Sequence, residues 1–460
     1  MIDLVDRLYD RALDTGRGLV ERRLRLGVTG LAEAGKTVFI TALVQALLHP
    51  SALPRFSVVA QGRLRTVLLR PQPSQDLPRF PFEECVARLT GALGKPDWPE
   101  STRTQAELRL SLRYIPGGLM AYLGERLLHL DLFDYPGEWL LDLALLNQTY
   151  ESWSRATLAE IRAASPQPEA AAYLDHLHRL APDQEDSQAE VQAIDSARLF
   201  TAFLQARQRK LGRSAPLGPG RFLLPGELEG SPLLTFAPLG PEGGKPAARG
   251  SLRRLMAERF QAYQDRVVKA FHQRHFTRLD RQILLIDLAG HLSQEEARAD
   301  AAAQALDAVL SALKIGGSSW LPRWLAPRID RVLFAATKAD HLPGDQHPAL
   351  EEQLRRKLDA SLRRTAYAGA RLETMALASI RATREVEARG VGHRYVAGQP
   401  YGRDQALAHY PGKIPQTGPI ASGSFRIERF RPPDNLDPRG PWPHLGLDRA
   451  LEFLVGDWLE

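Results

Sequence analysis

Residues 24–37 read LRLGVTGLAEAGKT and are followed by the apolar run VFITALVQALL. Leu24, Leu26 and Val28 alternate with polar or small residues, which predicts a strand, and the run after Thr37 is long enough for a helix. The loop between them fits G-x-x-x-x-G-K-[ST], whose backbone N–H groups surround phosphates while its lysine reaches the terminal phosphate and its hydroxyl holds Mg²⁺. This strand–loop–helix order predicts an α/β fold of the P-loop NTPase class.

The phosphate loop supplies the first expected site residues. We expect Lys36 to neutralise charge during phosphoryl transfer and Thr37 to bind Mg²⁺. Glu33 is an unusual neighbour for phosphate, so its side chain is expected to point outward. The residues expected to bind the nucleotide here are Gly30, Glu33, Ala34, Gly35, Lys36, Thr37 and Val38.

Length, charge and cysteine content limit the class of protein. A chain of 460 residues, 44% of them hydrophobic, predicts one large or two modest globular domains. The single cysteine, Cys85, excludes an intramolecular disulfide and a cysteine-built zinc site, and it suits a reducing compartment such as the cytoplasm. The net charge of +6 permits contact with an anionic membrane face, nucleic acid or an acidic protein, but no recognised nucleic-acid module accompanies it.

The N-terminus and the rest of the chain offer no candidate membrane span. The first residues include acidic side chains and place Leu4, Leu8 and Ala12 on one side of an amphipathic helix, which is not the pattern of a signal peptide. A membrane-spanning helix needs a run of about 18 apolar residues, and the sequence contains none.

Strand and helix patterns alternate in the first and last parts of the chain. Residues 1–149 form the first part of the predicted nucleotide-binding domain, and residues 277–460 form its second part, which ends in a helix. The stretch AELRLSLRY, residues 106–114, alternates leucines with polar residues and predicts a half-buried strand. In the second part, Ser293 begins a capping box S-x-x-E before a helix, and residues 385–435 have an irregular composition.

Residues 150–276 differ from both of these parts. They are rich in Ala, Leu, Glu, Gln and Arg, which predicts an all-α insertion. Within it, residues 214–250 are rich in Pro and Gly and predict a long loop that is mobile or faces a partner. The helices are expected at 151–165, 168–181, 187–212 and 251–275.

A second motif of nucleotide sites, D-x-x-G, occurs three times in the chain. In GTPases its aspartate holds Mg²⁺ through water, and its glycine N–H senses the γ-phosphate. We favour Asp134 to Gly137, because this match ends the second strand after the P-loop helix, where a Mg²⁺-binding strand belongs. Asp287 ends the next strand, and its alternative role is to cap the following helix. The third match begins at Asp437 in a predicted loop.

A third motif predicts which base is bound. Thr337, Lys338 and Asp340 lie in the turn TKAD, directly after the strand RVLFAA. A [NT]-K-x-D turn reads guanine, because its carboxylate accepts from the ring N1–H and the exocyclic amine while the lysine stem packs along the base. Adenine does not offer this pair of donors, so the aspartate would be left unpaired. The alternative is a plain turn with a surface lysine. After the next strand, Ser379 and Ile380 resemble the S-A-K loop whose backbone contacts guanine.

These four elements, in this order and each at the end of a strand, resemble the translation-factor-like class of P-loop GTPases. More narrowly, DYPGEWLLDL and the TKADH turn, with a large helical insertion between them, resemble the YcjX family of bacterial P-loop GTPase-like proteins. The resemblance covers essentially the whole chain and implies a Ras-like G domain with a large all-α insertion between switch II and the next core strand. It implies that Asp134 binds Mg²⁺, that Gly137 senses the γ-phosphate, and that Lys338 and Asp340 read guanine. It also implies a role in stress response and a partner in the inner membrane, to which the cytoplasmic protein attaches peripherally.

Two parts of the expected switch machinery are not fixed by a motif. A switch I threonine should complete the Mg²⁺ shell just before the strand at 106–114, and both Thr102 and Thr104 qualify.

Small GTPases often carry Gln directly after D-x-x-G, whereas this chain carries Glu138. A carboxylate is repelled by the γ-phosphate unless it turns away, is protonated or is paired with a cation. Glu138 therefore acts either as a base on water or structurally, and we favour the structural role with slow intrinsic hydrolysis. The expected catalytic residues are Lys36, Gly137 and Glu138.

Three functions are compatible with these patterns. The favoured one is a Mg²⁺-dependent switch that binds and hydrolyses GTP. The second is a scaffold that binds GDP or GTP with negligible turnover, which Glu138 and the large insertion would allow. The third is a P-loop ATPase or small-molecule kinase, and the TKAD turn argues against it.

Overall fold

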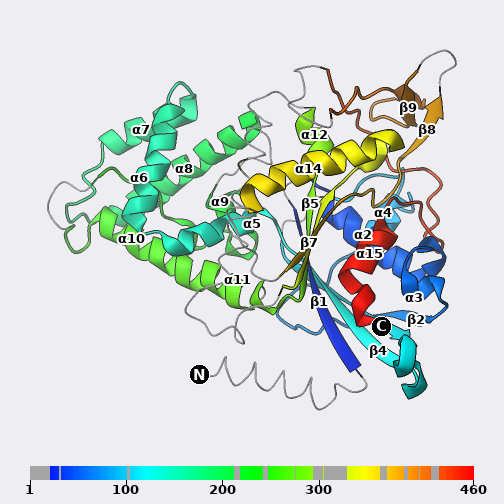
Figure 1. The fold of residues 1–460 in the computed structure, drawn as a ribbon. Coiled ribbons are helices and arrows are strands. Elements are labelled where there is room, and N and C mark those ends of the chain that lie inside the picture. The colour runs from blue at the N-terminus through cyan, green and yellow to red at the C-terminus, as the bar shows by residue number, and fades with distance from the viewer. Residues whose placement is uncertain are drawn as a thin grey trace. The chain divides into compact units, whose positions relative to one another are not determined.

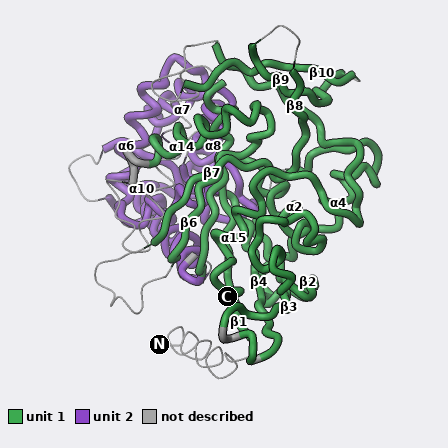
Figure 2. The backbone as a smooth tube through the Cα atoms, turned by 45° about the vertical axis from the view of Figure 1, so that its right-hand side comes forward, with its two compact units in different colours: residues 1–136, 279–296, 327–460 green, residues 137–278, 297–326 purple. Residues whose placement is uncertain are grey.

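The computed structural model describes most of the chain (Figure 1) and divides into two compact units (Figure 2). Unit 1 comprises residues 1–136, 279–296 and 327–460, and unit 2 comprises residues 137–278 and 297–326. The amphipathic helix predicted at the N-terminus lies outside the described residues. These are 21–30, 33–100, 104–211, 218–241, 247–274, 276–293, 304, 329–362, 370–387, 392–403, 405–415 and 424–460.

Unit 1 is built on a seven-stranded sheet with the strand order β2-β3-β4-β1-β5-β6-β7 (Figure 1). β3 is antiparallel to both of its neighbours, and every other neighbouring pair is parallel. This mixed sheet with helices between its strands confirms the predicted α/β class. The strands are β1 (Glu21–Gly30), β2 (Leu64–Arg70), β3 (Ala106–Tyr114), β4 (Arg126–Asp134), β5 (Arg281–Ile286), β6 (Arg331–Ala336) and β7 (Arg371–Ala376).

One face of this sheet is packed with hydrocarbon side chains. Leu26, Val28 and Leu130 are fully buried in one cluster with residues of α2, α4 and α15. Burying a leucine or valine contributes about 1.5–3 kcal/mol, so this cluster is a main source of stability for unit 1. Ser293 is the C-cap residue of α12, and the helix predicted to begin after it lies outside the described residues. The described helices of unit 1 include α2 (Lys36–Leu48), α3 (Ser57–Ala60), α4 (Phe82–Leu89), α12 (Leu288–Leu292), α14 (His347–Leu362) and α15 (Leu447–Val455).

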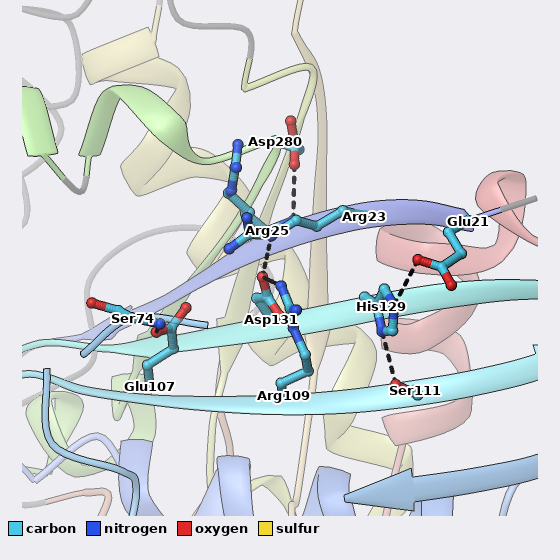
Figure 3. Close-up of polar contacts among 10 residues, drawn as sticks. All are labelled: Glu21, Arg23, Arg25, Ser74, Glu107, Arg109, Ser111, His129, Asp131 and Asp280. Carbon is cyan, nitrogen blue, oxygen red and sulfur yellow. Dashed lines mark hydrogen bonds and ion pairs between the residues drawn. The ribbon is translucent and has the colours of Figure 1, made fainter. Parts of the chain in front are cut away.

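The opposite face of β1, β3 and β4 carries charged side chains (Figure 3). Asp131 of β4 accepts a hydrogen bond from Arg23 of β1 and two from Arg109 of β3, the latter at 2.6 and 2.8 Å. The prediction of a half-buried β3 is therefore wrong in part: Arg113 is exposed, but Glu107 and Ser111 on this polar face are only 1% and 2% exposed. Oγ of Ser111 shares a hydrogen bond with Nδ1 of His129, and Oε2 of Glu107 accepts one from the N–H of Ser74, which offsets part of the cost of burying them.

A second sheet of three antiparallel strands follows β7 and has the order β10-β9-β8. The prediction that residues 385–435 are irregular is therefore wrong in part. The strands are only three to five residues long, and the Gly, Pro and Tyr between them leave no alternating pattern long enough to detect. They are β8 (Thr383–Glu387), β9 (Arg394–Gly398) and β10 (Leu407–His409).

Unit 2, where it is described, consists of helices and turns around an aromatic core. The ring of Trp153 lies 5.1–6.0 Å from the ring centroids of Phe200, Phe236 and Phe260. Phe236 belongs to the Pro/Gly-rich stretch and is fully buried, so this part of the stretch packs into the core and does not face a partner. A π-helical segment at Gln264–Val268 interrupts the last predicted helix. The helices are α5 (Glu138–Leu141), α6 (Tyr150–Ala163), α7 (Pro168–His178), α8 (Ala189–Leu211), α9 (Gly220–Leu223), α10 (Leu252–Tyr263) and α11 (Lys269–Arg274). Across the described residues of both units, no helix has the length and apolar character of a membrane span.

Candidate nucleotide-binding site

The predicted phosphate loop joins the end of β1 to the start of α2. Gly30 lies so close to β5 that a Cβ atom here would be 2.4 Å from the carbonyl oxygen of Leu285. Gly35 is the N-cap residue of α2 and has a φ of +85°, which glycine adopts without steric penalty. Nζ of Lys36 donates a 2.8 Å hydrogen bond to the carbonyl oxygen of Gly30. The local structure thus explains why glycine occupies both positions of the motif. The side chain of Lys36 folds back over the loop.

The remaining residues expected to bind phosphate differ in exposure and backbone conformation. Ala34 is buried, Val38 is half-buried and Glu33 is exposed. Glu33 has a φ of +65° and Lys338 a φ of +57°, and within the described ranges these are the only non-glycine residues with positive φ. A non-glycine residue in this region costs on the order of 1–3 kcal/mol and needs support from its surroundings. The two strained residues lie in the two loops that the sequence assigns to phosphate and guanine.

Thr37 and Asp134 are the expected Mg²⁺ ligands, and both belong to unit 1. Asp134 ends β4, pairs in register with Val28 of β1 and is 2% exposed. Thr37 lies in the first turn of α2, and its hydroxyl donates to the carbonyl oxygen of Glu100 at 3.4 Å. A hydroxyl and a carboxylate suit Mg²⁺, which usually completes its shell with water and phosphate oxygens. The donor set therefore fits Mg²⁺, although no three His, Cys, Asp or Glu side chains of the described segments form a metal site by themselves.

The expected switch I threonines lie just before β3. Thr102 is outside the described residues. Thr104 is exposed and precedes the first residue of β3 by two positions. The Mg²⁺-binding role of either threonine stays a prediction.

The segment before these threonines is anchored to the region of the second sheet. Nε1 of Trp98 donates to the carbonyl oxygen of Phe430 at 2.8 Å, and the hydroxyl of Tyr401 donates to Asp97 at 2.5 Å. The ring of Phe430 also packs edge-on against His341, which follows the guanine turn, with 5.3 Å between the ring centroids. The sequence does not reveal these contacts, because the hydrogen-bond partners are 332 and 304 positions apart in the chain.

The predicted guanine turn after β6 contacts the loop after β7. Oδ2 of Asp340 accepts a 2.8 Å hydrogen bond from the backbone N–H of Ala382, and Asp340 is 6% exposed. Ser379 and Ile380 lie in the same loop as Ala382. Oγ1 of Thr337 is buried and has no hydrogen-bond partner in the described part of the chain. The structure therefore brings the two expected guanine loops together within unit 1.

The three D-x-x-G matches have different structural roles. Asp134 ends β4, whereas Asp437 lies in an exposed turn. Asp287 directly follows β5, and its carboxylate accepts a 2.9 Å hydrogen bond from the N–H of Gly290, so it caps α12 as the alternative predicted. The same carboxylate forms an ion pair with Nζ of Lys338 at 2.6 Å. The sequence did not reveal this ion pair.

Gly137 and Glu138, the other residues expected near the γ-phosphate, belong to unit 2. Glu138 begins α5 and is 7% exposed. Its carbonyl oxygen lies so close to Gly220 that a Cβ atom on that glycine would be 2.3 Å away. The roles of Gly137 and Glu138 at a bound phosphate stay predictions.

The Pro/Gly-rich stretch fixes the chain around α5 inside unit 2. Asp142 accepts 2.6 Å hydrogen bonds from the hydroxyl of Tyr263 and from the N–H of Gly220, and burial raises the pKa of Asp142 to about 6. The guanidinium of Arg221 stacks over the ring of Trp139, 3.2 Å from its centroid. The sequence does not reveal this pair, because its members are far apart in the chain and the composition around Arg221 predicts only a loop.

The strand–loop–helix start, the parallel strands around it and the paired loops after β6 and β7 define an α/β protein with a P-loop arrangement. The chain belongs to the YcjX-like family, DUF463, whose profile matches residues 24–459. It is 36% identical over 470 aligned positions to the Ras-like GTPase YcjX of Shewanella oneidensis, which covers 96% of this chain and 95% of that protein. It is 35% identical over 460 positions to the Ras-like GTPase YcjX of Escherichia coli, with 96% and 97% covered. The family resemblance found in the sequence is thereby confirmed.

Proposed function

We propose that this protein is a guanine-nucleotide-binding switch that hydrolyses GTP slowly and requires Mg²⁺. The observation that supports this most directly is that two motif-bearing loops follow parallel strands of one sheet. The phosphate loop follows β1, and the guanine turn follows β6 and is hydrogen-bonded to the loop after β7. The relatives' name, Ras-like GTPase, supports the same function.

Base selection would depend on Asp340. Its carboxylate would accept hydrogen bonds from N1–H and the exocyclic amine of guanine, while the stem of Lys338 packs along the base. Asp340 is 6% exposed, so pairing it with adenine would leave a buried carboxylate without these donors. The backbone around Ser379 and Ile380 would complete the base site.

Phosphate binding would depend on the loop from Gly30 to Val38. Lys36 would leave or share its bond with the Gly30 carbonyl to neutralise the terminal phosphates. Thr37 and Asp134 would hold Mg²⁺, and the bound ion would neutralise charge on the phosphate oxygens. Gly137 would sense the γ-phosphate through its N–H group.

Slow hydrolysis is proposed because Glu138 takes the place of the usual glutamine. A carboxylate is repelled by the γ-phosphate, so a structural role for Glu138 is favoured over that of a base. Glu138→Gln should therefore leave the single-turnover rate within about threefold of the original, since a structural side chain contributes little to the barrier. A large fall in this rate would identify Glu138 as the base. Binding without any measurable turnover would favour the scaffold alternative.

We further propose that residues 1–149 and 277–460, which include all of unit 1, form a Ras-like G domain, and that residues 150–276 are an all-α insertion after switch II. Its support is that the described residues between β4 and β5 form helices and turns, while the same sheet continues with β5. GTP would order residues 134–145, and the insertion would move with them. Identical hydrogen exchange across residues 138–276 with GDP and with a GTP analogue would contradict this coupling.

The family resemblance also leads us to propose a stress-related role and peripheral attachment to an inner-membrane partner. The net charge of +6 supports contact with an acidic or anionic surface. Co-sedimentation with inner-membrane vesicles, before and after protease treatment of the vesicles, tests this proposal. Binding that survives the protease would indicate lipid, and no binding in either case would contradict membrane attachment.

The deciding experiment is equilibrium binding of fluorescent GDP and ADP, each with Mg²⁺. The original protein should bind GDP tightly and ADP weakly, and Asp340→Ala should lose this preference. An equal preference, or a preference for ADP, would overturn the guanine assignment and place the P-loop ATPase first. Repeating the GDP titration with excess chelator measures the Mg²⁺ requirement.

A further inference from the structure

We propose that Asp287 is a positioning residue for guanine recognition, because it fixes the side chain of Lys338. This inference rests on the proposed function and names a determinant of base selectivity outside the TKAD turn. Asp287 matches D-x-x-G, yet its carboxylate contacts Lys338 of the guanine turn and caps α12 through Gly290. Its proposed role is therefore different from that of the Mg²⁺-binding aspartate.

Asp287 and Lys338 form a close and partly buried ion pair. Oδ2 of Asp287 lies 2.6 Å from Nζ of Lys338. The aspartate side chain is 15% exposed and the lysine side chain 37%, so water only partly screens the pair. Because the lysine is anchored at its far end, the position of its aliphatic stem is defined before a base arrives. The lysine side chain therefore loses less conformational freedom when a base packs along its stem.

The carboxylate of Asp287 is itself held in place. It accepts a 2.9 Å hydrogen bond from the N–H of Gly290 at the start of α12. A Cβ atom at position 290 would lie only 2.6 Å from both carboxylate oxygens, so only glycine leaves room here for the carboxylate of Asp287. The D-x-x-G pattern at this place is thus explained by helix capping and by the ion pair.

The charge environment keeps this aspartate ionised. Burial raises its pKa, but the charge of Lys338, with smaller contributions from His291 and the hydrogen bonds, outweighs burial and lowers the pKa below its usual value. Lys338 is also one of the two described non-glycine residues with positive φ. An ion pair with a fixed carboxylate is one of the interactions that can support this strained backbone.

The test uses Asp287→Asn, because asparagine caps helices as well as aspartate does but carries no charge. The variant should lose about tenfold in GDP affinity, which corresponds to about 1.4 kcal/mol, and keep its weak ADP affinity. The matched control is Asp437→Asn, the same change at an exposed D-x-x-G match. Its GDP affinity should stay unchanged. Unaltered or tighter GDP binding by Asp287→Asn would overturn the inference.

A double-mutant cycle separates positioning from general damage. If Asp287 acts through Lys338, then adding Asp287→Asn to a Lys338→Ala protein should change GDP affinity by less than about twofold. A further tenfold loss in that background would overturn the positioning role. The cycle remains informative where Asp287→Asn lowers thermal stability, because it compares affinities within the folded fraction.

The outcome also distinguishes this inference from the proposed function. If Asp340→Ala abolishes the preference for GDP over ADP while Asp287→Asn does not alter it, the function stands and the positioning role fails. If neither variant alters the preference, the guanine assignment itself fails. Loss of preference in both variants supports both proposals.

Discussion

On the face of the seven-stranded sheet that carries Leu130, neighbouring strands contribute hydrocarbon. On the face that carries Asp131, one residue later, the same strands contribute charges (Figure 3). Leu130 lies between Leu24 of β1 and Leu110 of β3 in register, whereas Asp131 lies opposite Arg109 of β3. Both faces exclude water from these central positions, since Leu130 and Asp131 are each 0% exposed.

The two faces differ in how precisely their side chains must be positioned for the fold to be stable. Hydrocarbon contacts are non-directional, so the apolar face tolerates small shifts at a modest loss of free energy. A buried carboxylate is stable only while its donors remain in place, because an unpaired buried charge is strongly penalised. Burial raises the pKa of Asp131, but the hydrogen bonds and charges of Arg109 and Arg23 outweigh it and lower the pKa. A shift in the register of β1, β3 and β4 would therefore separate Asp131 from its donors.

The largest expected effect breaks the polar face. Asp131→Ala would leave Arg23 and Arg109 without their shared carboxylate, at side-chain exposures of 26% and 18%. We expect the free energy of unfolding to fall by about 3–5 kcal/mol, the usual result of removing one partner of a buried ion pair. Urea unfolding at pH 7 measures this, with the exposed Asp76→Ala as control. A loss below about 1 kcal/mol would mean that water replaces the carboxylate and that the stability of this face does not require the ion pairs of Asp131.

The next effect breaks the apolar face at the neighbouring residue. Leu130→Ala removes a fully buried side chain and leaves a cavity, so we expect a loss of about 3 kcal/mol. Leu93→Ala is the matched control, because Leu93 is 72% exposed and its truncation should change stability by less than about 0.5 kcal/mol. Raising the salt concentration should leave the Leu130→Ala loss unaltered. A salt-dependent loss would mean that the cavity disturbs the charges on the other face.

The two faces also differ in how far the sequence predicts them. The alternation of Leu24, Leu26 and Val28 predicts a strand and its apolar side from local pattern alone. The ion pair between Arg23 and Asp131 joins positions 108 residues apart, so it appears only when the register of β1 and β4 is known. This is why β3 was expected to have a solvated side.

The candidate site divides in the same way. Gly35 and Lys36 belong to a local motif whose strand, loop and helix are consecutive, so the sequence predicts both the motif and its element order. The pair of Asp287 and Lys338 spans 51 residues, and the pattern D-x-x-G at Asp287 suggested a different chemistry. Short strands such as β8 were missed for lack of a long enough pattern.

On the polar face, the stability of the protein should also depend on pH, with the smallest change in free energy of the three. Glu107 lies on the polar face, where Ser74 donates its N–H to Oε2 at 3.2 Å. Its other oxygen, Oε1, is buried without a hydrogen-bond partner in the segments that the structure describes. Burial and the nearby charge of Asp131 raise the pKa of Glu107 to about 7, against the partial opposition of Arg23 and Arg109. The folded protein thus keeps a proton on Glu107 that the unfolded chain loses near its ordinary pKa of about 4.3.

The sign of the pH effect follows from this difference in proton binding. Between about pH 4.5 and 7 the folded state binds more protons than the unfolded state, so the contribution of Glu107 to stability falls as pH rises. Glu107→Gln removes this titration. Its stability relative to the original protein should therefore increase by on the order of 2 kcal/mol between pH 5 and pH 8. Urea unfolding across this range measures it, with the exposed Glu84→Gln as the surface control. If the stability of Glu107→Gln relative to the original protein does not change with pH, Glu107 is already ionised in the folded protein. If this relative stability decreases as pH rises, the charges of Arg23 and Arg109 outweigh burial.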